Sequence, residues 1–206
     1  KLNAKLEQRV IERTAELETE IAEHRATQAE LLHVALHDGL TGSPNRASFL
    51  QQINHELAQN QQTPSHQFAV LLLNCDHFNR INNSFGYTVG EQLLIALHHR
   101  LASYLTDSDM LARIEGDQYA VLLSSIDSIN DAIQLAEKIQ HLFQAPFQLD
   151  EREFFVNTSI GIVAGESYYE KAEHLLRDAG TALADAKALG RNRYLVFDEA
   201  MRTRLQ

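Results

Sequence analysis

The sequence predicts an α+β fold in which helices flank a central, mostly antiparallel sheet, preceded by a long N-terminal helix. Three observations predict it. Residues 1–36 contain no Gly or Pro and are rich in Glu, Ala, Arg and Leu, which favours one continuous helix. Further along, apolar runs of strand length alternate with segments of helical periodicity. Two of these runs are separated only by Glu115-Gly116-Asp117, which indicates a hairpin and therefore antiparallel pairing.

Each later element follows from its local pattern. Gly39, Gly42 and Pro44 interrupt the first helix. The apolar patterns then predict strands at 68–75, 111–114, 119–123, 154–164 and 194–197, and helices at 45–58, 89–105, 128–143 and 170–189. Asp76 to Tyr87 is expected to be a loop, and Gly190 should end the last helix. Strands alternating with helices around a hairpin are typical of helices packed on a largely antiparallel sheet.

Composition narrows the class of protein. The chain has 206 residues, 44% hydrophobic and 22% charged, which suits one globular domain with an appendage. Its net charge of −10 argues against a nucleic-acid binder. No apolar run approaches the length of a membrane span, so this segment is expected to make no membrane contact. The single cysteine, Cys75, excludes an internal disulfide and is compatible with the cytoplasm.

The N-terminal helix carries a poor heptad pattern. One seam passes through Asn3, Val10, Leu17, His24 and Leu31. The other takes Leu6, Arg13, Glu20, Thr27 and Val34. Half-polar seams predict a weak coiled coil that pairs two copies of the chain reversibly. The alternative is a solvated helix packed on its own domain.

Four separated segments, at residues 37–46, 74–82, 113–119 and 186–193, resemble the motifs of the bacterial GGDEF family in order and spacing. They correspond to D-x-L-T-G-L-P-N-R, D-x-D-x-F-K-x-I-N, R-x-G-G-D-E-F and A-K-x-x-G-R-N-R. The resemblance implies a palm-like cyclase fold over residues 37–198, preceded by a signalling helix at 1–36. Active members join two GTP molecules into cyclic di-GMP with metal ions held by carboxylates.

The resemblance also implies that the metal site has degenerated. Asn74 stands where the family has a metal-binding aspartate, and Gln118 where it has a glutamate that activates the ribose hydroxyl. Glu115 replaces the first signature glycine. Asp117 keeps the acidic third position. Asp76, two residues after Asn74, is either a substitute ligand or an acid that caps its loop.

More of the nucleotide site matches the family. The resemblance assigns guanine recognition to Asn82 and Glu91 and phosphate binding to Lys187 and Arg191, which are four residues apart and expected on one helix face. The alternative for the two cations is that they complement a helix C-terminus. The motif residues His77, Phe78 and Asn79 complete the expected nucleotide site, with Asn79 replacing a phosphate-binding lysine.

Two further sites are not expected. Thr106 and Asp109 occupy the inhibitory R-x-x-D motif, which here lacks its arginine, so no inhibitory cyclic di-GMP site is expected. His37-Asp38 suggests an HD phosphohydrolase, but the motif at residues 37–46 explains this pair better.

The sequence therefore predicts a GGDEF domain without catalytic residues, acting as a regulatory module that binds GTP, with Mg²⁺ only when GTP is bound. The alternatives are an active cyclase with non-standard metal ligands and a purely structural dimerisation unit. The tail at 199–206 resembles the start of a linker to an EAL phosphodiesterase domain. Expected partners are a second copy of the chain and sensor and EAL domains in the same protein, which is placed in the cytoplasm or in the cytoplasmic part of a membrane-bound sensor.

Overall fold

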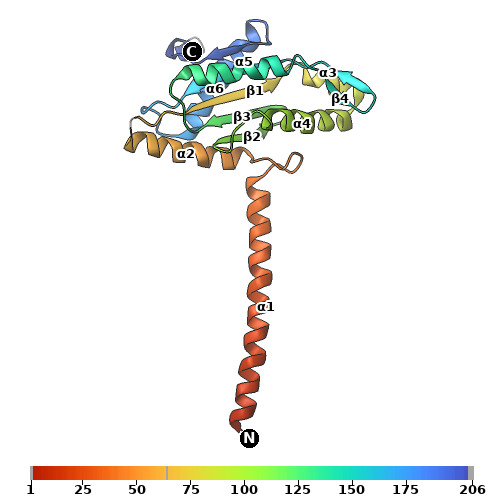
Figure 1. Ribbon diagram of the computed structural model, residues 1–206, viewed down its shortest axis with the longest axis vertical. Coiled ribbons are helices and arrows are strands. Elements are labelled where there is room, and N and C mark those ends of the chain that lie inside the picture. The colour runs from red at the N-terminus through yellow and green to blue at the C-terminus, as the bar shows by residue number, and fades with distance from the viewer. Residues whose placement is uncertain (1, 64, 204–206) are drawn as a thin grey trace. The chain divides into compact units, whose positions relative to one another are not determined.

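The computed structural model describes residues 2–63 and 65–203. The chain divides into two compact units, Lys1–His37 and Asp38–Gln206. The first unit is helix α1 (Leu2–Leu36), shown in red to orange in Figure 1, and every side chain from Glu16 to Ala35 is exposed. The seam positions Asn3, Leu6 and Val10 lie outside the described side chains. Among the described helices, none is both long and apolar enough to cross a membrane.

The second unit is built on a five-stranded sheet with strand order β2-β3-β1-β6-β7. Its strands are β1 (Ala69–Cys75), β2 (Asp109–Glu115), β3 (Gln118–Leu123), β6 (Thr158–Ala164) and β7 (Tyr194–Val196). All neighbours pair antiparallel except β6 and β7, which are parallel. The predicted fold class, helices around a mostly antiparallel sheet, is confirmed.

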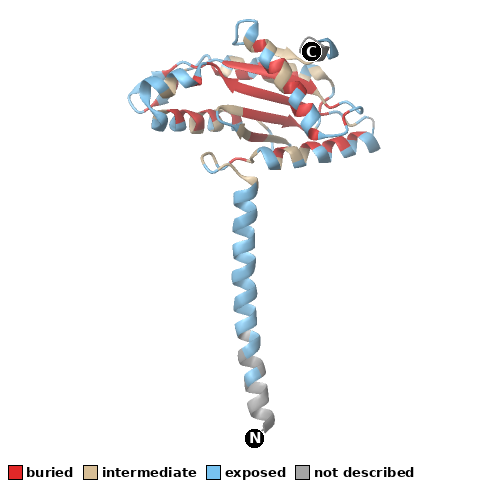
Figure 2. Ribbon diagram, turned by 180° about the vertical axis from the view of Figure 1, so that it is seen from behind, coloured by how far each residue is buried: buried red, intermediate tan, exposed pale blue. Residues whose placement is uncertain are grey.

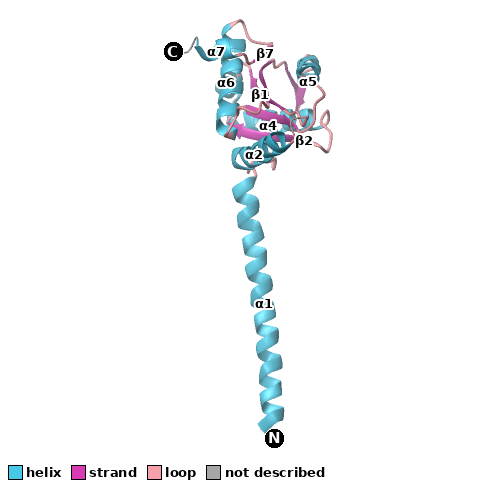
Figure 3. Cartoon of the chain, turned by 90° about the vertical axis from the view of Figure 1, so that its left-hand side faces the viewer, coloured by secondary structure: helices cyan, strands magenta, loops and turns pink. Residues whose placement is uncertain are grey.

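Helices cover both faces of this sheet, which Figure 3 shows from the side. One face of β1 points Ala69, Leu71 and Leu73 into a cluster with α4 (Tyr87–Ala102) and α5 (Ile129–Leu142). The other face points Val70 and Leu72 toward α2 (Arg46–Gln62) and α6 (Ala172–Ala188). The strand is therefore buried along its whole length, as the red strands of Figure 2 show. A strand covered on both faces reads as a continuous apolar run, which is the pattern of residues 68–73.

Gly161 fixes how closely α6 approaches the sheet. A Cβ atom at this position in β6 would collide with the backbone oxygen of Ala179 and lie 2.5 Å from the backbone nitrogen of Leu183. Because these are backbone atoms, they cannot move aside as a side chain would. Glycine is thus required for the packing of α6 on β6.

Two expected elements are wrong. Residues 76–87 were expected to be loop, but they contain helix α3 (Phe78–Phe85). Its apolar residues Phe78, Ile81 and Phe85 have helical spacing, but the helix has only 8 residues, which is too short for that spacing to identify it. The expected strand at 154–164 is two pieces: β6 begins at Thr158, while β5 (Arg152–Phe154) forms a separate hairpin with β4 (Phe147–Leu149). The alternating pattern of side chains continues through both pieces, so the sequence does not show where the first strand ends and the second begins.

A short helix, α7 (Glu199–Thr203), contacts α6 and buries Met201. It occupies most of the tail that was expected to begin a linker. Residues 204–206 of that tail lie outside the described residues.

Candidate functional site

The end of β1 and the β2–β3 turn bring together the residues that the sequence assigned to the metal site. Asn74 is buried and lies directly between Gln118 of β3 and Ser159 of β6. Asp117 follows in the two-residue turn of the predicted hairpin, and its backbone oxygen accepts from Cys75 N at 3.4 Å. Asn74, Asp76, Asp117 and Gln118 are called the strand-end site below.

Asp117 is the half-buried carboxylate of this site. Burial raises its pKa above the ordinary value, and the negative charge of Asp76 acts in the same direction. Its own backbone amide, the ammonium of Lys187 and the side-chain amide of Asn74 lower that pKa in part. Lys187 and Asn74 are therefore close enough to interact with this carboxylate in the folded protein.

Asp76 ties three segments together. Ser159 Oγ donates to both of its carboxylate oxygens, at 2.8 and 3.0 Å, and Asn192 N donates to Oδ2 at 2.9 Å. Its own backbone N–H donates to Asn157 O at 2.9 Å. Both oxygens of this buried carboxylate thus have protein donors. These contacts are those of an acid that anchors its loop, the alternative to a substitute metal ligand.

The two phosphate-binding candidates follow from how α6 ends. Arg191 N donates to Ala186 O and Gly190 N to Lys187 O, with Gly190 at φ 115°, which is a Schellman motif. Gly190 therefore ends this helix as predicted. The expectation that Lys187 and Arg191 share one helix face is wrong, because α6 ends at Ala188 and Arg191 lies beyond it with φ 61°. The bond from Asn192 to Asp76 holds this turn against the strand-end site.

Arg113 clamps the hairpin turn, a role that the sequence analysis missed. Its Nη1 donates to both oxygens of Asp38, at 2.9 and 3.0 Å, and its Nε and Nη2 donate to Gly116 O at 2.9 and 2.8 Å. Burial raises the pKa of Asp38, but hydrogen bonds from Thr41 and Arg113 outweigh it and hold that pKa below its ordinary value. An arginine between apolar residues of a strand, three residues before Gly116, was the available signal.

The guanine candidates lie on the neighbouring helices. Asn82, on α3, packs against Gly90 of α4, where a Cβ atom would collide with Asn82 Oδ1. That oxygen is buried and has no hydrogen-bond donor among the described residues. Glu91 is exposed in the second turn of α4, so its carboxylate is available to a ligand.

The other motif residues of α3 divide between surface and core. His77 precedes the helix with φ 62° and is exposed, as is Asn79. Phe78 belongs to the hydrophobic cluster between the sheet and α4. The structure thus leaves His77 and Asn79 accessible and gives Phe78 a packing role.

The strand-end site offers few anionic ligands to a divalent metal. Magnesium takes hard oxygen ligands in an octahedron and is usually held by one or two carboxylates. Asp117 is the remaining carboxylate at this site, since Asp76 is taken by its donors and Asn74 and Gln118 are neutral. In the described part of the chain, no group of three or more His, Cys, Asp or Glu residues is placed so that it could hold a metal ion.

Residues around the signature contribute little to a site. Glu115 is exposed at the end of β2, opposite Gln118. Asp109 accepts from Thr106 N at 2.9 Å and from Thr106 Oγ1 at 2.7 Å, which closes a local turn. Thr106 and Asp109, the two positions of the inhibitory motif, are therefore hydrogen-bonded to each other.

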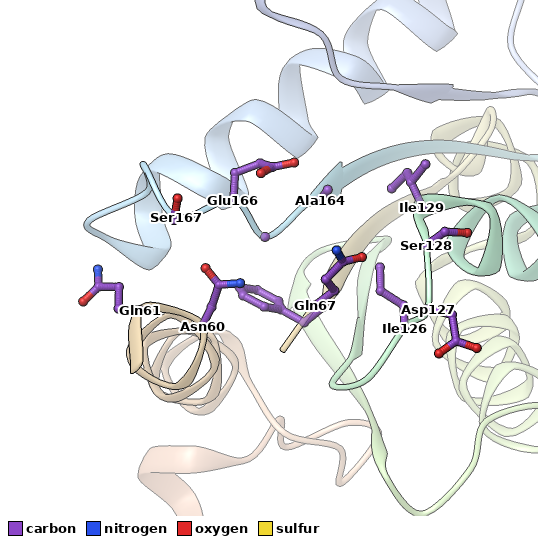
Figure 4. A pocket seen from close by; sticks show the side chains of 12 residues that line it. Asn60, Gln61, Gln67, Ile126, Asp127, Ser128, Ile129, Ala164, Glu166 and Ser167 are labelled. Atoms are coloured by element: carbon purple, nitrogen blue, oxygen red, sulfur yellow. The ribbon is translucent and has the colours of Figure 1, made fainter. Parts of the chain in front are cut away.

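A cavity of about 500 Å³ lies at the opposite end of the sheet (Figure 4). Polar side chains at its wall come from the end of α2, the loop before α5 and the loop after β6, among them Asn60, Ser128 and Glu166. None of the expected site residues lines it. The nucleotide candidates and this cavity are therefore separate features.

Comparison with known proteins agrees with these motifs. The family profile "Diguanylate cyclase, GGDEF domain" matches residues 35–193. The cyclic di-GMP phosphodiesterase NbdA of Pseudomonas aeruginosa is 35% identical over 85% of this chain and 22% of its own length. The bifunctional diguanylate cyclase/cyclic di-GMP phosphodiesterase MucR of the same species is 32% identical over 98% of this chain and 29% of its own length.

A solved structure shows the same fold. The GGDEF domain of TpbB (YfiN) from P. aeruginosa superposes with a TM-score of 0.78 and 32% identity, covering 82% of this chain and 99% of that domain. The chain spans less than a third of the length of NbdA and of MucR, so it corresponds to one part of such proteins. Given the profile match, the four motifs and the shared fold, the chain belongs to the GGDEF family.

Proposed function

We propose that this GGDEF domain makes no cyclic di-GMP and instead binds GTP as a regulatory module of cyclic di-GMP signalling. The observation that carries the proposal is the uneven loss at its site. At the strand-end site Asp76 is held by Ser159 and Asn192 and Asp117 is the other carboxylate, while Lys187, Arg191 and Asn82 remain at the positions that the family resemblance assigns to the nucleotide.

The absence of cyclase activity follows from the chemistry of the substituted side chains. Joining two nucleotides requires the ribose hydroxyl to lose its proton and the triphosphate charge to be neutralised. Gln118 cannot accept a proton at neutral pH, and Asn74 brings no negative charge for a metal. Asp76 would have to give up its two donors, the Ser159 hydroxyl and the Asn192 N–H, to replace either of them.

GTP binding is supported by the groups that remain. Asn82 Oδ1 is a buried acceptor without a donor in the described protein, and the amino and imino groups of guanine are donors. Glu91 offers an exposed carboxylate in the following helix for the same edge of the base. Lys187 and Arg191 are cations held at one end of the sheet by the turn after α6, where they would meet phosphates.

Isothermal titration of the 206-residue chain with GTP tests the binding. We expect saturable binding that is at least about 10-fold weaker in Lys187→Ala, since one phosphate ion pair is lost. Lys171→Ala, at the opposite end of α6, is the matched control and should bind like the wild type. If the wild-type chain binds no GTP, the proposal is contradicted. The remaining alternative is then a purely structural dimerisation unit.

A cyclase assay tests the other half of the proposal. The purified protein is incubated with GTP and Mg²⁺ or Mn²⁺, and cyclic di-GMP is sought by chromatography. We expect none. The diguanylate cyclase TpbB, 35% identical over 85% of this chain, makes the active alternative worth testing. If the wild type makes cyclic di-GMP and Asp76→Ala does not, the domain is an active cyclase in which Asp76 is the substitute ligand. The proposal that the domain is inactive would then be refuted.

We also propose that α1 pairs two copies of the chain. Leu17, Ile21, Leu31, Leu32 and Val34 are large apolar side chains that are 43–70% exposed on this helix. Burying such side chains against a second helix would release apolar surface from water. Analytical ultracentrifugation should find a dimer that Leu31→Glu weakens and that Glu18→Gln, an exposed change on the same helix, does not.

The partners within the whole protein are the upstream sensor and a downstream EAL domain, and the module would relay the sensor's state to the EAL domain. In the whole protein, Lys187→Ala and Asn82→Ala should change phosphodiesterase activity if bound GTP is the signal. If both variants leave that activity unchanged while GTP binding is lost, the domain serves as a scaffold.

A further inference from the structure

The cavity at the end of the sheet opposite the strand-end site has the size of a small-molecule site. Its volume of about 500 Å³ lies within the range of about 300–1,000 Å³ in which proteins hold small ligands. The loops before α5 and after β6, which form part of its wall, are both tied to the chain just before β1. Ile126 N donates to Gln67 O at 3.0 Å, and Gly165 N donates to Phe68 O at 2.8 Å. The cavity is therefore formed by segments that the sheet itself holds in place.

Asn60, in the last turn of α2, brings a buried oxygen without a donor to this cavity. The residue is 7% exposed, and its Nδ2 donates to His66 O at 2.6 Å, which fixes the orientation of the amide. Its Oδ1 has no hydrogen-bond donor among the described residues. In Figure 4 this oxygen points from α2 toward the loop that carries Glu166 and Ser167, which also line the cavity. Because a buried acceptor without a donor is unfavourable, a ligand that brings an N–H group to Asn60 would be stabilised.

The charges at the cavity are negative. The charged side chains among the described residues that line it are Glu166 and Asp127, and both are exposed. Figure 4 shows the carboxylate of Glu166 along the cavity wall, toward Ala164, whereas the carboxylate of Asp127 points away from the other labelled side chains. Ile126 and Ile129 add apolar surface to the lining. A matching ligand therefore has a positive charge, N–H donors and an apolar part.

We propose that this cavity binds a small organic cation whose N–H groups face Asn60 Oδ1 and the carboxylate of Glu166. The apolar part of the ligand would lie against Ile126 and Ile129. An amidinium or guanidinium group fits this description, because it is planar, positively charged and rich in N–H donors. The proposal is independent of GTP binding, since none of the residues assigned to the nucleotide lines the cavity.

Benzamidine, benzamide and benzoate test the preference for charge, because they have nearly the same shape and are a cation, a neutral amide and an anion. Each is titrated into the 206-residue chain and followed by amide nitrogen–proton correlation spectra. We expect saturable shifts with benzamidine in the loops before α5 and after β6, and an affinity at least about 10-fold above that of benzoate. Absence of saturable benzamidine binding, equal affinities for the three compounds, or shifts confined to other parts of the domain would each overturn the proposal.

Glu166→Gln tests the ion pair. It should weaken benzamidine binding about 3–5-fold, the effect of one partly exposed ion pair, and leave benzamide binding unchanged. Asp127→Asn is the matched control: it removes the same charge from the same cavity, but its side chain points away, so benzamidine affinity should stay within about 1.5-fold of the wild type. Equal losses in the two variants would attribute the preference to the general negative charge of the domain and overturn the proposed contact.

Asn60→Leu tests the unbonded oxygen. It should weaken benzamidine and benzamide alike, about 5-fold, because both ligands carry N–H groups. Gln61→Leu, the same type of change at the next residue of the cavity wall, is the control and should have little effect. Circular dichroism establishes that each variant is folded. A folded Asn60→Leu variant that binds both ligands like the wild type would overturn the assignment of Asn60 to the site.

Discussion

Replacing Arg113 with methionine should make the domain unfold more readily, because the Arg113 side chain joins the motif at residues 37–46 to the hairpin turn through its guanidinium. Its guanidinium makes four hydrogen bonds, two to the carboxylate of Asp38 and two to Gly116 O. Methionine keeps much of the apolar stem and removes all four. Asp38 would retain donors in Thr41 and Leu40, whereas Gly116 O would lose both of its donors.

The expected loss lies between those of buried and surface ion pairs. Breaking a fully buried pair costs about 3–5 kcal/mol, and an exposed one about 0–1 kcal/mol. The Arg113 and Asp38 side chains are 13% and 22% exposed, nearer the buried limit, but Asp38 keeps its other donors. We therefore expect the free energy of unfolding to fall by about 2–3 kcal/mol.

Urea unfolding followed by circular dichroism measures this change. With a slope of about 2 kcal/mol/M, the midpoint should fall by about 1–1.5 M. Arg177→Met is the matched control: Arg177 is 62% exposed and its Nε lies 3.7 Å from Asp178, so its loss should shift stability by less than about 0.5 kcal/mol. Equal midpoint shifts in the two variants would refute the clamp.

The same pair predicts the response to acid. The pKa of Asp38 is lowered in the folded state, so its contribution is present above the ordinary value of about 3.9 and is lost as pH falls through the folded pKa. The wild type should therefore lose more stability than Arg113→Met between about pH 4 and pH 2. A steeper acid loss in the variant would contradict this assignment.

Two further substitutions test other parts of the structure. Gly161→Ala should lower the free energy of unfolding by about 3 kcal/mol in urea, because its Cβ meets the backbone of α6, while Gly39→Ala, with open space around it, should change little. Asp117→Asn should stabilise the protein at pH 7: burial raises the pKa of Asp117, so its stabilising contribution is present at low pH and lost as pH rises through that pKa. The variant and the wild type should therefore unfold alike near pH 3, and a variant less stable than the wild type at pH 7 would show that the carboxylate is favourably placed.

The central sheet could be predicted because its strands have simple signals. β1 is a continuous apolar run, and the turn between β2 and β3 is marked by Gly116 between two apolar segments. Long helices such as α6 show a full apolar period and end at a glycine. These features depend on a few neighbouring residues, which a sequence displays directly.

Features that depend on distant contacts could not be predicted. Helix α3 is set by its ends, His77 and Gly86, both at positive φ, and by a single buried side chain. The donors to Asp76 come from Ser159 and Asn192, which no local pattern connects to it. Arg191 leaves the helix because of the turn at Gly190, although its spacing from Lys187 suggested one face.

The hydrogen bond between Asp76 and Asn192 has a consequence for the order of folding. It joins positions 116 residues apart, so it can form only after nearly the whole domain has been synthesised and α6 has packed on the sheet. A nascent chain that ends before Asn192 can pair β1 with β3 and β6, yet it cannot hold Lys187 and Arg191 beside the end of β1. The proposed nucleotide site is thus completed last, and a ribosome-bound fragment would form the sheet before this site is complete.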